Sequence, residues 1–164
     1  KPPPNPEVRC DLINQLSIAA GPLGMVGGQM LDLVAEKKKL SLNEILLLQK
    51  LKTGELFRFA CIAGPILSEL KNIKIFVNYS KNLGLAFQIK DDLLDIEGDE
   101  KKMGKKTKKD LSRGKETLVS FYGLAKAKKK SQELIKNSVN LLKPFGIKSK
   151  RLIELTNFVI SRNK

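Results

Sequence analysis

Histidine and tryptophan are absent from this sequence of 164 residues, and cysteine occurs only twice. Without histidine, a catalytic triad that uses imidazole as its base is excluded, and two cysteines are too few for a structural zinc site. Cys10 and Cys61 lie far apart in the sequence, so we expect free thiols in a reducing, cytoplasmic compartment. Aromatic residues make up 5% of the chain, which fits helices whose core consists of Leu, Ile and Ala.

Long apolar runs are also missing. A membrane-spanning helix needs about 20 apolar residues in a row, whereas the most apolar stretch, residues 59–67, is short and is interrupted by Gly64-Pro65. The sequence also opens without a basic segment followed by an apolar one, which is the pattern of a secretion signal. We therefore expect no stable membrane insertion and no secretion.

The formal net charge is +14, and lysine supplies most of the positively charged side chains. Nucleic-acid-binding proteins commonly use arginine for base contacts and aromatic side chains for stacking. The lysine runs here contain no aromatic residues, and arginine occurs only at positions 9, 58, 113, 151 and 162. A lysine-rich solvated surface is the first interpretation, an anionic substrate for particular lysines the second, and a nucleic-acid partner a distant third.

The spacing of apolar residues is helical along the chain. Asn5-Pro6 marks a helix start, and Ser41 with Glu44 forms a capping box. The glycine-rich stretch 21–28 predicts a break or a kink at which another helix approaches closely. Neither an alternating strand pattern nor an internal repeat occurs, so we expect an all-α fold in a single domain over residues 1–164. The expected helices cover residues 5–20, 45–63, 66–96 with an interruption near 72, 116–142 and 149–162, and residues 98–114 are expected to form a polar loop.

Acidic residues are concentrated in the segment 87–95. On a helix, Asp91 and Asp95 lie on one face, Asp92 lies at its edge, and Gln88 precedes them by one turn. Like charges at this spacing repel, so a hard dication that neutralises them explains their density. Magnesium takes oxygen ligands and uses one or two carboxylates together with substrate phosphates. A solvated acidic face is the alternative. The apolar stripe expected to hold this helix against a core is Leu85, Ile89 and Leu93.

The residues around this segment favour the metal interpretation. Phe87-Gln88 ahead of Asp91-Asp92-Leu93-Leu94-Asp95 resembles the second aspartate-rich motif of the isoprenyl diphosphate synthases. The sequence is most similar in character to the bacterial farnesyl diphosphate synthases, or geranyltranstransferases, of that family. Further motifs of the family occur in the same order, and they are Gly24-Met25-Val26-Gly27-Gly28-Gln29 with Asp32, Leu51-Lys52-Thr53-Gly54-Glu55-Leu56, Gly104-Lys105, and Gly114-Lys115-Glu116-Thr117.

The resemblance implies a fold and a reaction. Members of the family are helical bundles around a central cavity, the isoprenoid synthase fold. They condense isopentenyl diphosphate with an allylic diphosphate such as geranyl or dimethylallyl diphosphate, with magnesium as cofactor, and release farnesyl or a related short-chain diphosphate. The intact enzyme is expected to be a cytoplasmic homodimer. Product length cannot be read here, because the family sets it mainly with residues just before its first aspartate-rich motif.

The resemblance also implies roles for individual residues. Lysine suits diphosphate binding because its ammonium group is a compact point charge, and fixed cations act where negative charge develops on the leaving group. Gln29 and Asp32 are equally compatible with a structural hydrogen-bonded pair. The expected magnesium ligands are Asp91, Asp92 and Asp95. The expected diphosphate-binding residues are Lys52, Lys105 and Lys115. The expected catalytic residues are Lys52, Thr53 and Gln88, and the expected pocket residues are Phe87, Gln29 and Asp32.

Some positions depart from the family pattern. Gln49 replaces a histidine that usually precedes the Lys-Thr-Gly lysine by three residues, which removes an ionisable group. Lys108 stands where a glycine is frequent, and Leu118-Val119 stand where Tyr-Pro is common. None of these changes removes a group that would bind phosphate or metal.

The larger departure concerns the first aspartate-rich motif and the arginine pair that follows it in the family's amino-terminal half. The acidic residues of this sequence outside 87–95 are too dispersed to form a second metal cluster. We therefore expect the carboxyl-terminal half of such an enzyme, without prenyl transfer by these residues alone. A non-catalytic subunit of the same fold is an alternative, although Lys52, Lys105 and the intact second motif argue against it. A basic nucleic-acid-binding helical module is a more remote one.

Overall fold

The structure is a computed structural model that describes residues 5–97 and 116–162. Lys105, Lys115 and the expected polar loop 98–114 lie outside the described residues. Helices and no strands occur in the described residues, as expected for the all-α class. The elements are α1 (Pro6–Ala20), α2 (Met25–Ala35), α3 (Leu42–Gln49), the π-helix η1 (Lys50–Gly54), α4 (Glu55–Leu67), α5 (Lys74–Glu97), α8 (Leu118–Tyr122), α9 (Leu124–Leu142), the 3-10 segment η2 (Lys143–Ser149) and α10 (Lys150–Ser161).

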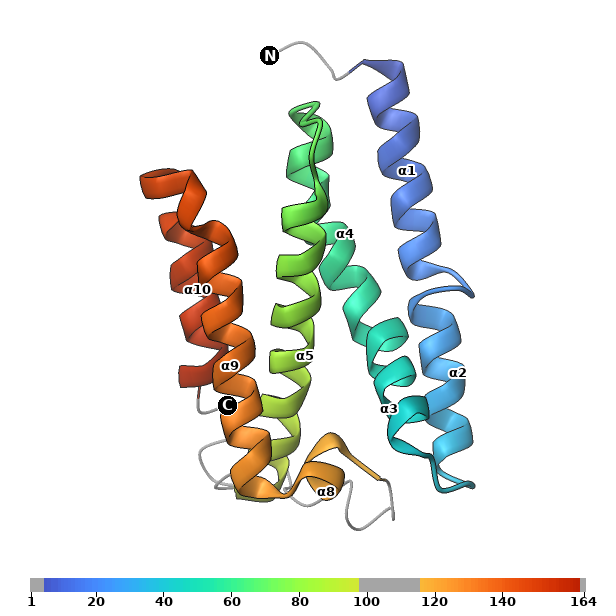
Figure 1. The fold of residues 1–164 in the computed structure, drawn as a ribbon. Coiled ribbons are helices and arrows are strands. Elements are labelled where there is room, and N and C mark those ends of the chain that lie inside the picture. Colours follow the sequence, from blue (N-terminus) through green and yellow to red (C-terminus); the bar gives the residue numbers. More distant parts are fainter. Residues whose placement is uncertain (1–4, 98–115, 163–164) are drawn as a thin grey trace.

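The long helix α5 occupies the middle of the bundle (Figure 1). It packs against α9 and α10 on one side and against α4 and η1 on the other. α1 lies along α4, and α2 lies along η1 and α3. α5 therefore lies between α1–α4 and α9–α10, and the short helix α8 contacts α3, α5 and α9.

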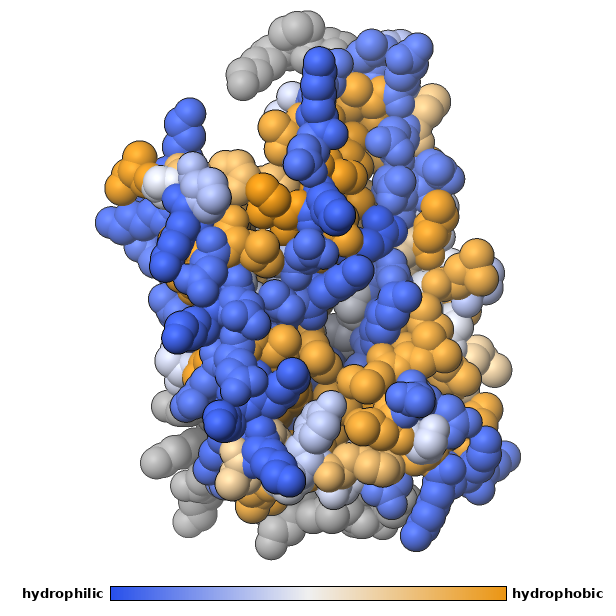
Figure 2. All heavy atoms as spheres, in the orientation of Figure 1, coloured by the Kyte–Doolittle hydropathy of each residue, from blue (hydrophilic) through white to orange (hydrophobic). Residues whose placement is uncertain are grey.

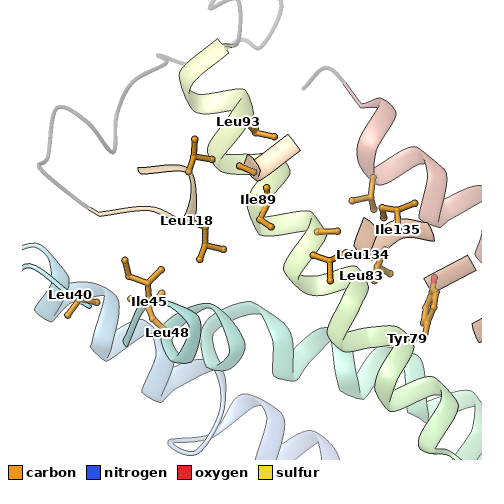
Figure 3. Close-up of a cluster of buried hydrophobic side chains, with 14 of the residues drawn as sticks. Leu40, Ile45, Leu48, Tyr79, Leu83, Ile89, Leu93, Leu118, Leu134 and Ile135 are labelled. Atoms are coloured by element: carbon orange, nitrogen blue, oxygen red, sulfur yellow. The ribbon is translucent and has the colours of Figure 1, made fainter. Parts of the chain in front are cut away.

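The core follows the buried face of α5. Ile89 and Leu93 from the predicted stripe are buried, and Leu85 is half-buried. These side chains meet apolar residues from α3, α8 and α9 in one cluster (Figure 3). At about 25 cal/mol per Å² of apolar surface removed from water, such a cluster is the main term that holds α5 in place. The members labelled in Figure 3 are Leu40, Ile45, Leu48, Tyr79, Leu83, Ile89, Leu93, Leu118, Leu134 and Ile135.

The predicted helix starts at Asn5-Pro6 and at Ser41 are confirmed. The Asn5 side chain accepts a hydrogen bond from the Glu7 N–H. Ser41 Oγ accepts from the Glu44 N–H, and the Glu44 carboxylate accepts from the Ser41 N–H at 2.8 Å. The hydrogen bond from the Ser41 backbone is the main reason that the pKa of Glu44 is lowered to about 2.

Two expected helix boundaries are wrong. Gly64-Pro65, expected to mark a break or a kink, is not a helix end, because α4 continues through Pro65 to Leu67. The interruption follows that helix, at residues 68–73. The expected helix 116–142 is divided at Gly123, whose φ of +74° is a left-handed conformation that ends α8 before α9 begins.

The predicted close approach in the glycine-rich stretch is present at Gly28. A Cβ atom added to Gly28 would lie 2.5 Å from the Lys52 Cα and closer still to the Lys52 N. The backbone of α2 therefore touches the backbone of η1, and only glycine allows this contact. The packing fixes where the Lys52 side chain leaves the helix.

Part of α1 and α2 is apolar and exposed. By length and composition alone, residues 6–35 are apolar enough to span a membrane, with a mean hydropathy of 1.3 over the best window and 17% of that window buried. These residues do not form an uninterrupted apolar run, because Asn, Gln, Ser and Gly are interspersed among the apolar ones. The run is divided at residues 21–24 into two helices, and a single run of this kind is only a weak indication of a membrane span. Figure 2 shows apolar surface over α2 and α3, whereas the side of α9 and α10 is largely hydrophilic.

Substitution of Gly28 by alanine tests the backbone contact between α2 and η1. We expect Gly28→Ala to lower the free energy of unfolding by about 1–3 kcal/mol, because the added methyl group forces two backbones apart. Gly54→Ala is the matched control, since a Cβ there meets its nearest atom at 3.6 Å, an ordinary contact. Urea titrations of both variants provide the measurement. Equal losses for the two variants would contradict the close-packing explanation.

Candidate active site

Lys52 and Thr53 lie in the π-helical turn η1, within a continuous helix that begins as α3 and ends as α4. A π-helical turn widens the helix locally and is frequent at functional sites. The sequence indicated a helix with Gly54 inside it but gave no sign of the wider turn. α5 packs closely against this turn near Gly84, where an added Cβ would lie 3.6 Å from the Gly54 Cα.

The ammonium group of Lys52 is paired with a carboxylate on α2. Lys52 Nζ lies 2.7 Å from Asp32 Oδ2, and the two side chains are 35% and 18% exposed. Two residues predicted for the site, from motifs 20 positions apart, are thus brought together. Gln29, one turn before Asp32 on α2, is exposed.

Asp91 on α5 is paired with an arginine that the sequence did not single out. Arg162, just after the end of α10, places Nη2 2.6 Å from Asp91 Oδ1. The same nitrogen lies 3.3 Å from the Phe87 carbonyl oxygen, and the guanidinium carbon lies 4.1 Å from the centre of the Phe87 ring. Sequence spacing could not reveal this pair, because 71 positions separate its members.

Phe87 connects α5 with α4 as well. Its ring centre lies 5.2 Å from that of Phe57 at an interplanar angle of 51°, a favourable tilted arrangement. Phe57 in turn contacts the backbone of α5 at Gly84. The aromatic pair joins the helix that carries Lys52 to the helix that carries the aspartates.

Asp92 points away from the exposed edge of α5. Its side chain is buried, and Oδ2 accepts a hydrogen bond of 3.0 Å from the Leu118 N–H at the start of α8. Asp95, one turn after Asp91, and Gln88, one turn before, are half-buried. The three predicted metal ligands therefore differ: Asp92 has a structural contact in the core, and Asp91 is tied to the end of α10.

Lys90 lies near the end of α5, beside Arg162. Burial lowers the pKa of Lys90 and the nearby Arg162 guanidinium lowers it further, whereas Glu97 raises it.

Two hollows border the helices of the site. An apolar one lies between α4, α5 and α10 and is lined by residues including Leu56, Phe57, Cys61 and Leu83. Burial raises the pKa of the Cys61 thiol to about 11, so this cysteine is a neutral apolar lining group. A second hollow, between η1 and α5, includes Gln49, whose Oε1 is buried and has no hydrogen-bond partner among the described residues.

The chemistry of the donor set fits one side of a magnesium site. Across residues 5–97 and 116–162, no three Cys, Asp or Glu side chains form a cluster that could hold a metal ion by themselves. Magnesium is commonly bound through one or two carboxylates and the phosphates of a substrate. Asp91 and Asp95, one turn apart on α5, are of the right type for such a partial site.

The fold and these motifs place the chain in a known family. Residues 10–151 match the polyprenyl synthetase family, and the chain belongs to it. It is 40% identical to the farnesyl diphosphate synthase of Micrococcus luteus over 98% of this chain and 56% of the relative. It is 37% identical to the Escherichia coli farnesyl diphosphate synthase over 95% of this chain and 54% of that protein. The chain spans about half the length of these relatives.

Solved structures give the same result for the fold. An FPP/GFPP synthase from Zymomonas mobilis is similar with a TM-score of 0.84 and 38% identity, over 94% of this chain and 52% of that one. A geranyltransferase from Helicobacter pylori, complexed with magnesium and isoprenyl diphosphate, is similar with a TM-score of 0.77 and 30% identity, over 96% and 52% of the two chains. The expected isoprenoid synthase fold is confirmed.

The buried position of Asp92 predicts a structural role that can be measured without substrate. We expect Asp92→Ala to lower the free energy of unfolding by about 1–3 kcal/mol, because the buried Leu118 N–H loses its acceptor. Asp92→Asn keeps an acceptor oxygen and should retain most of the stability. Asp11→Ala, at an exposed position, is the control and should change stability by less than about 0.5 kcal/mol. If urea titrations gave Asp92→Ala the same free energy of unfolding as the wild type, this structural role would be refuted.

Proposed function

We propose that the chain forms the carboxyl-terminal side of the active site of a magnesium-dependent prenyltransferase. The reaction is the condensation of isopentenyl diphosphate with an allylic diphosphate, geranyl or dimethylallyl, to farnesyl or a related short-chain diphosphate. The observation that carries the proposal is the packing of η1, which bears Lys52, against α5, which bears Asp91 and Asp95. The Helicobacter pylori relative, complexed with magnesium and isoprenyl diphosphate, supports it.

Asp91 and Asp95 are the proposed metal-binding carboxylates. When bound, magnesium neutralises charge on the diphosphate and so assists its departure from the allylic carbon. Asp92 contributes from the core, where its hydrogen bond to Leu118 fixes the rotation of α5 about its axis. The buried residues Ile89 and Leu93 hold the opposite face of the same turns.

Lys52 is the proposed diphosphate-binding residue of η1, together with Lys105 and Lys115 outside the described residues. Its pairing with Asp32 holds the ammonium group in place before substrate arrives. This partly exposed ammonium group can then donate a charge-assisted hydrogen bond to a phosphate oxygen, in place of or in addition to its bond to Asp32. Positive charge fixed in advance stabilises the charge that develops on the leaving diphosphate.

The carbocation that forms after ionisation requires a site with little water and few nucleophiles. The Phe57–Phe87 pair supplies apolar surface beside the proposed diphosphate site. Thr53 and Gln88 are proposed to place oxygens near the cationic carbon, and Gln29 is proposed to complete the pocket wall from α2. The exposure of Gln29 is consistent with a position on an open side of the pocket.

We also propose that the intact enzyme is a cytoplasmic homodimer without a nucleic-acid partner. Support for an association surface comes from the apolar strip on α1 and α2, where Ile13 is 66% and Met30 is 57% exposed. Apolar side chains repeated at this spacing along a helix suit packing against other helices. The free thiols Cys10 and Cys61 are compatible with a reducing compartment.

A binding experiment tests the proposed role of Lys52. We expect the chain to bind geranyl thiolodiphosphate in the presence of magnesium and to lose this binding when EDTA removes the metal. Lys52→Ala should weaken binding roughly tenfold or more, because a charge-assisted hydrogen bond to phosphate is lost. Lys50→Ala is the matched control, since Lys50 is exposed and borders the hollow of Gln49 instead. Calorimetry gives the affinities. Equal losses of affinity for Lys52→Ala and Lys50→Ala would contradict the proposed diphosphate-binding role of Lys52.

The same proposal predicts that the 164 residues alone do not turn over substrate. Only one aspartate-rich motif is present in them, and the chemistry requires carboxylates on two sides of the diphosphate. We expect no product from geranyl and isopentenyl diphosphates in a radiolabel assay in which a full-length relative serves as the positive control. Product formation by this chain would contradict the prediction and would leave the proposed substrates in place.

A further inference from the structure

The contacts of Arg162 are concentrated on the residues of the proposed metal site. One guanidinium nitrogen, Nη2, donates hydrogen bonds to both Asp91 Oδ1, at 2.6 Å, and the Phe87 carbonyl oxygen, at 3.3 Å. The flat face of the same group covers the Phe87 ring at 4.1 Å. The Arg162 side chain is 12% exposed, so solvent screens these interactions only weakly.

The guanidinium group of Arg162 places a positive charge beside Asp91. Asp95 lies one turn further along the same face of α5, where two like charges repel. Arg162 therefore relieves, in the absence of metal, the repulsion that a dication would otherwise relieve.

The pairing of Arg162 with Asp91 does not use the full hydrogen-bonding capacity of the guanidinium. Arginine and carboxylate commonly form two parallel hydrogen bonds. Here Nη2 makes the contact with Asp91, and the buried Nε–H has no hydrogen-bond partner among the described residues. A buried donor without an acceptor costs stability, so this arrangement is less stable than a two-bond pair and is easier to rearrange.

We infer that Arg162 is a positioning residue that acts as an internal counter-ion of Asp91 and sets which form of the metal the site accepts. This inference rests on the proposed function, because it assumes that Asp91 binds the dication. A bare dication is repelled by the neighbouring guanidinium. A dication that already carries diphosphate has a net negative charge, and the guanidinium attracts it. Arg162 thus disfavours metal without diphosphate and favours the metal–diphosphate complex.

The test compares two probes, Mn²⁺ alone and Mn²⁺ with inorganic pyrophosphate, with bound metal measured by electron paramagnetic resonance. Arg162→Gln should bind Mn²⁺ alone about three- to tenfold more tightly than the wild type, because the repulsion between the two cations is removed. The same variant should bind the Mn²⁺–pyrophosphate complex more weakly. Arg162→Lys keeps the charge and should restore most of the wild-type preference. Arg151→Gln is the control, because Arg151 is an exposed arginine of α10 that pairs with Glu154.

The outcomes separate this inference from the proposed function. Unchanged or weaker binding of Mn²⁺ alone by Arg162→Gln overturns the inference, as does a similar response of Arg151→Gln. Binding of both probes that is insensitive to Asp91→Asn overturns the proposed metal role of Asp91 and the inference with it. Circular dichroism of each variant checks that the helical fold is retained, and loss of both affinities by Arg162→Gln with an intact fold overturns the inference.

Discussion

Every proposed function of this chain depends on the packing of α5. Buried residues on one face, including Leu83, Ile89 and Leu93, fix its rotation in the core. The opposite edge is then left to Asp91 and Asp95, whereas Asp92 is buried. η1 packs against another part of the same helix, near Gly84. If α5 rotated by a fraction of a turn, Asp91 and Asp95 would enter the apolar cluster. The hydrophobic core and the candidate site are therefore set by the same contacts.

The charged residues of the site have partners before any ligand arrives. Lys52 is held by Asp32, Asp91 is held by Arg162, and Asp92 is held by a backbone N–H. These contacts join α2, η1, α5, α8 and α10, so electrostatics and packing fix the same arrangement. Such a site is largely organised in advance. Under the proposed function, binding of an anionic substrate would require these side chains to exchange partners, and few loose side chains would have to be ordered.

The chain belongs to the polyprenyl synthetase family and spans about half the length of its relatives, so it carries only part of the family's motifs. It carries the helix with the second aspartate-rich motif and the helix with the lysine, and these two pack together. Under the proposed function, the carboxylates of a second motif would enclose a metal-bound diphosphate from the other side. The apolar strip on α1 and α2 is a further surface that remains exposed in this chain.

The sequence by itself determined the helical class, the helix starts at Asn5 and Ser41, the buried stripe of α5 and the order of the family motifs, because these depend on neighbours within one or two turns. The tertiary structure decided what depends on distant segments. The partners of Asp91 and Asp92 come from the end of α10 and the start of α8, far along the chain. Local spacing gives no signal for such contacts. They arise only when the core brings the helices together, and for that reason Arg162 was not singled out and the carboxylate of Asp92 was not expected in the core.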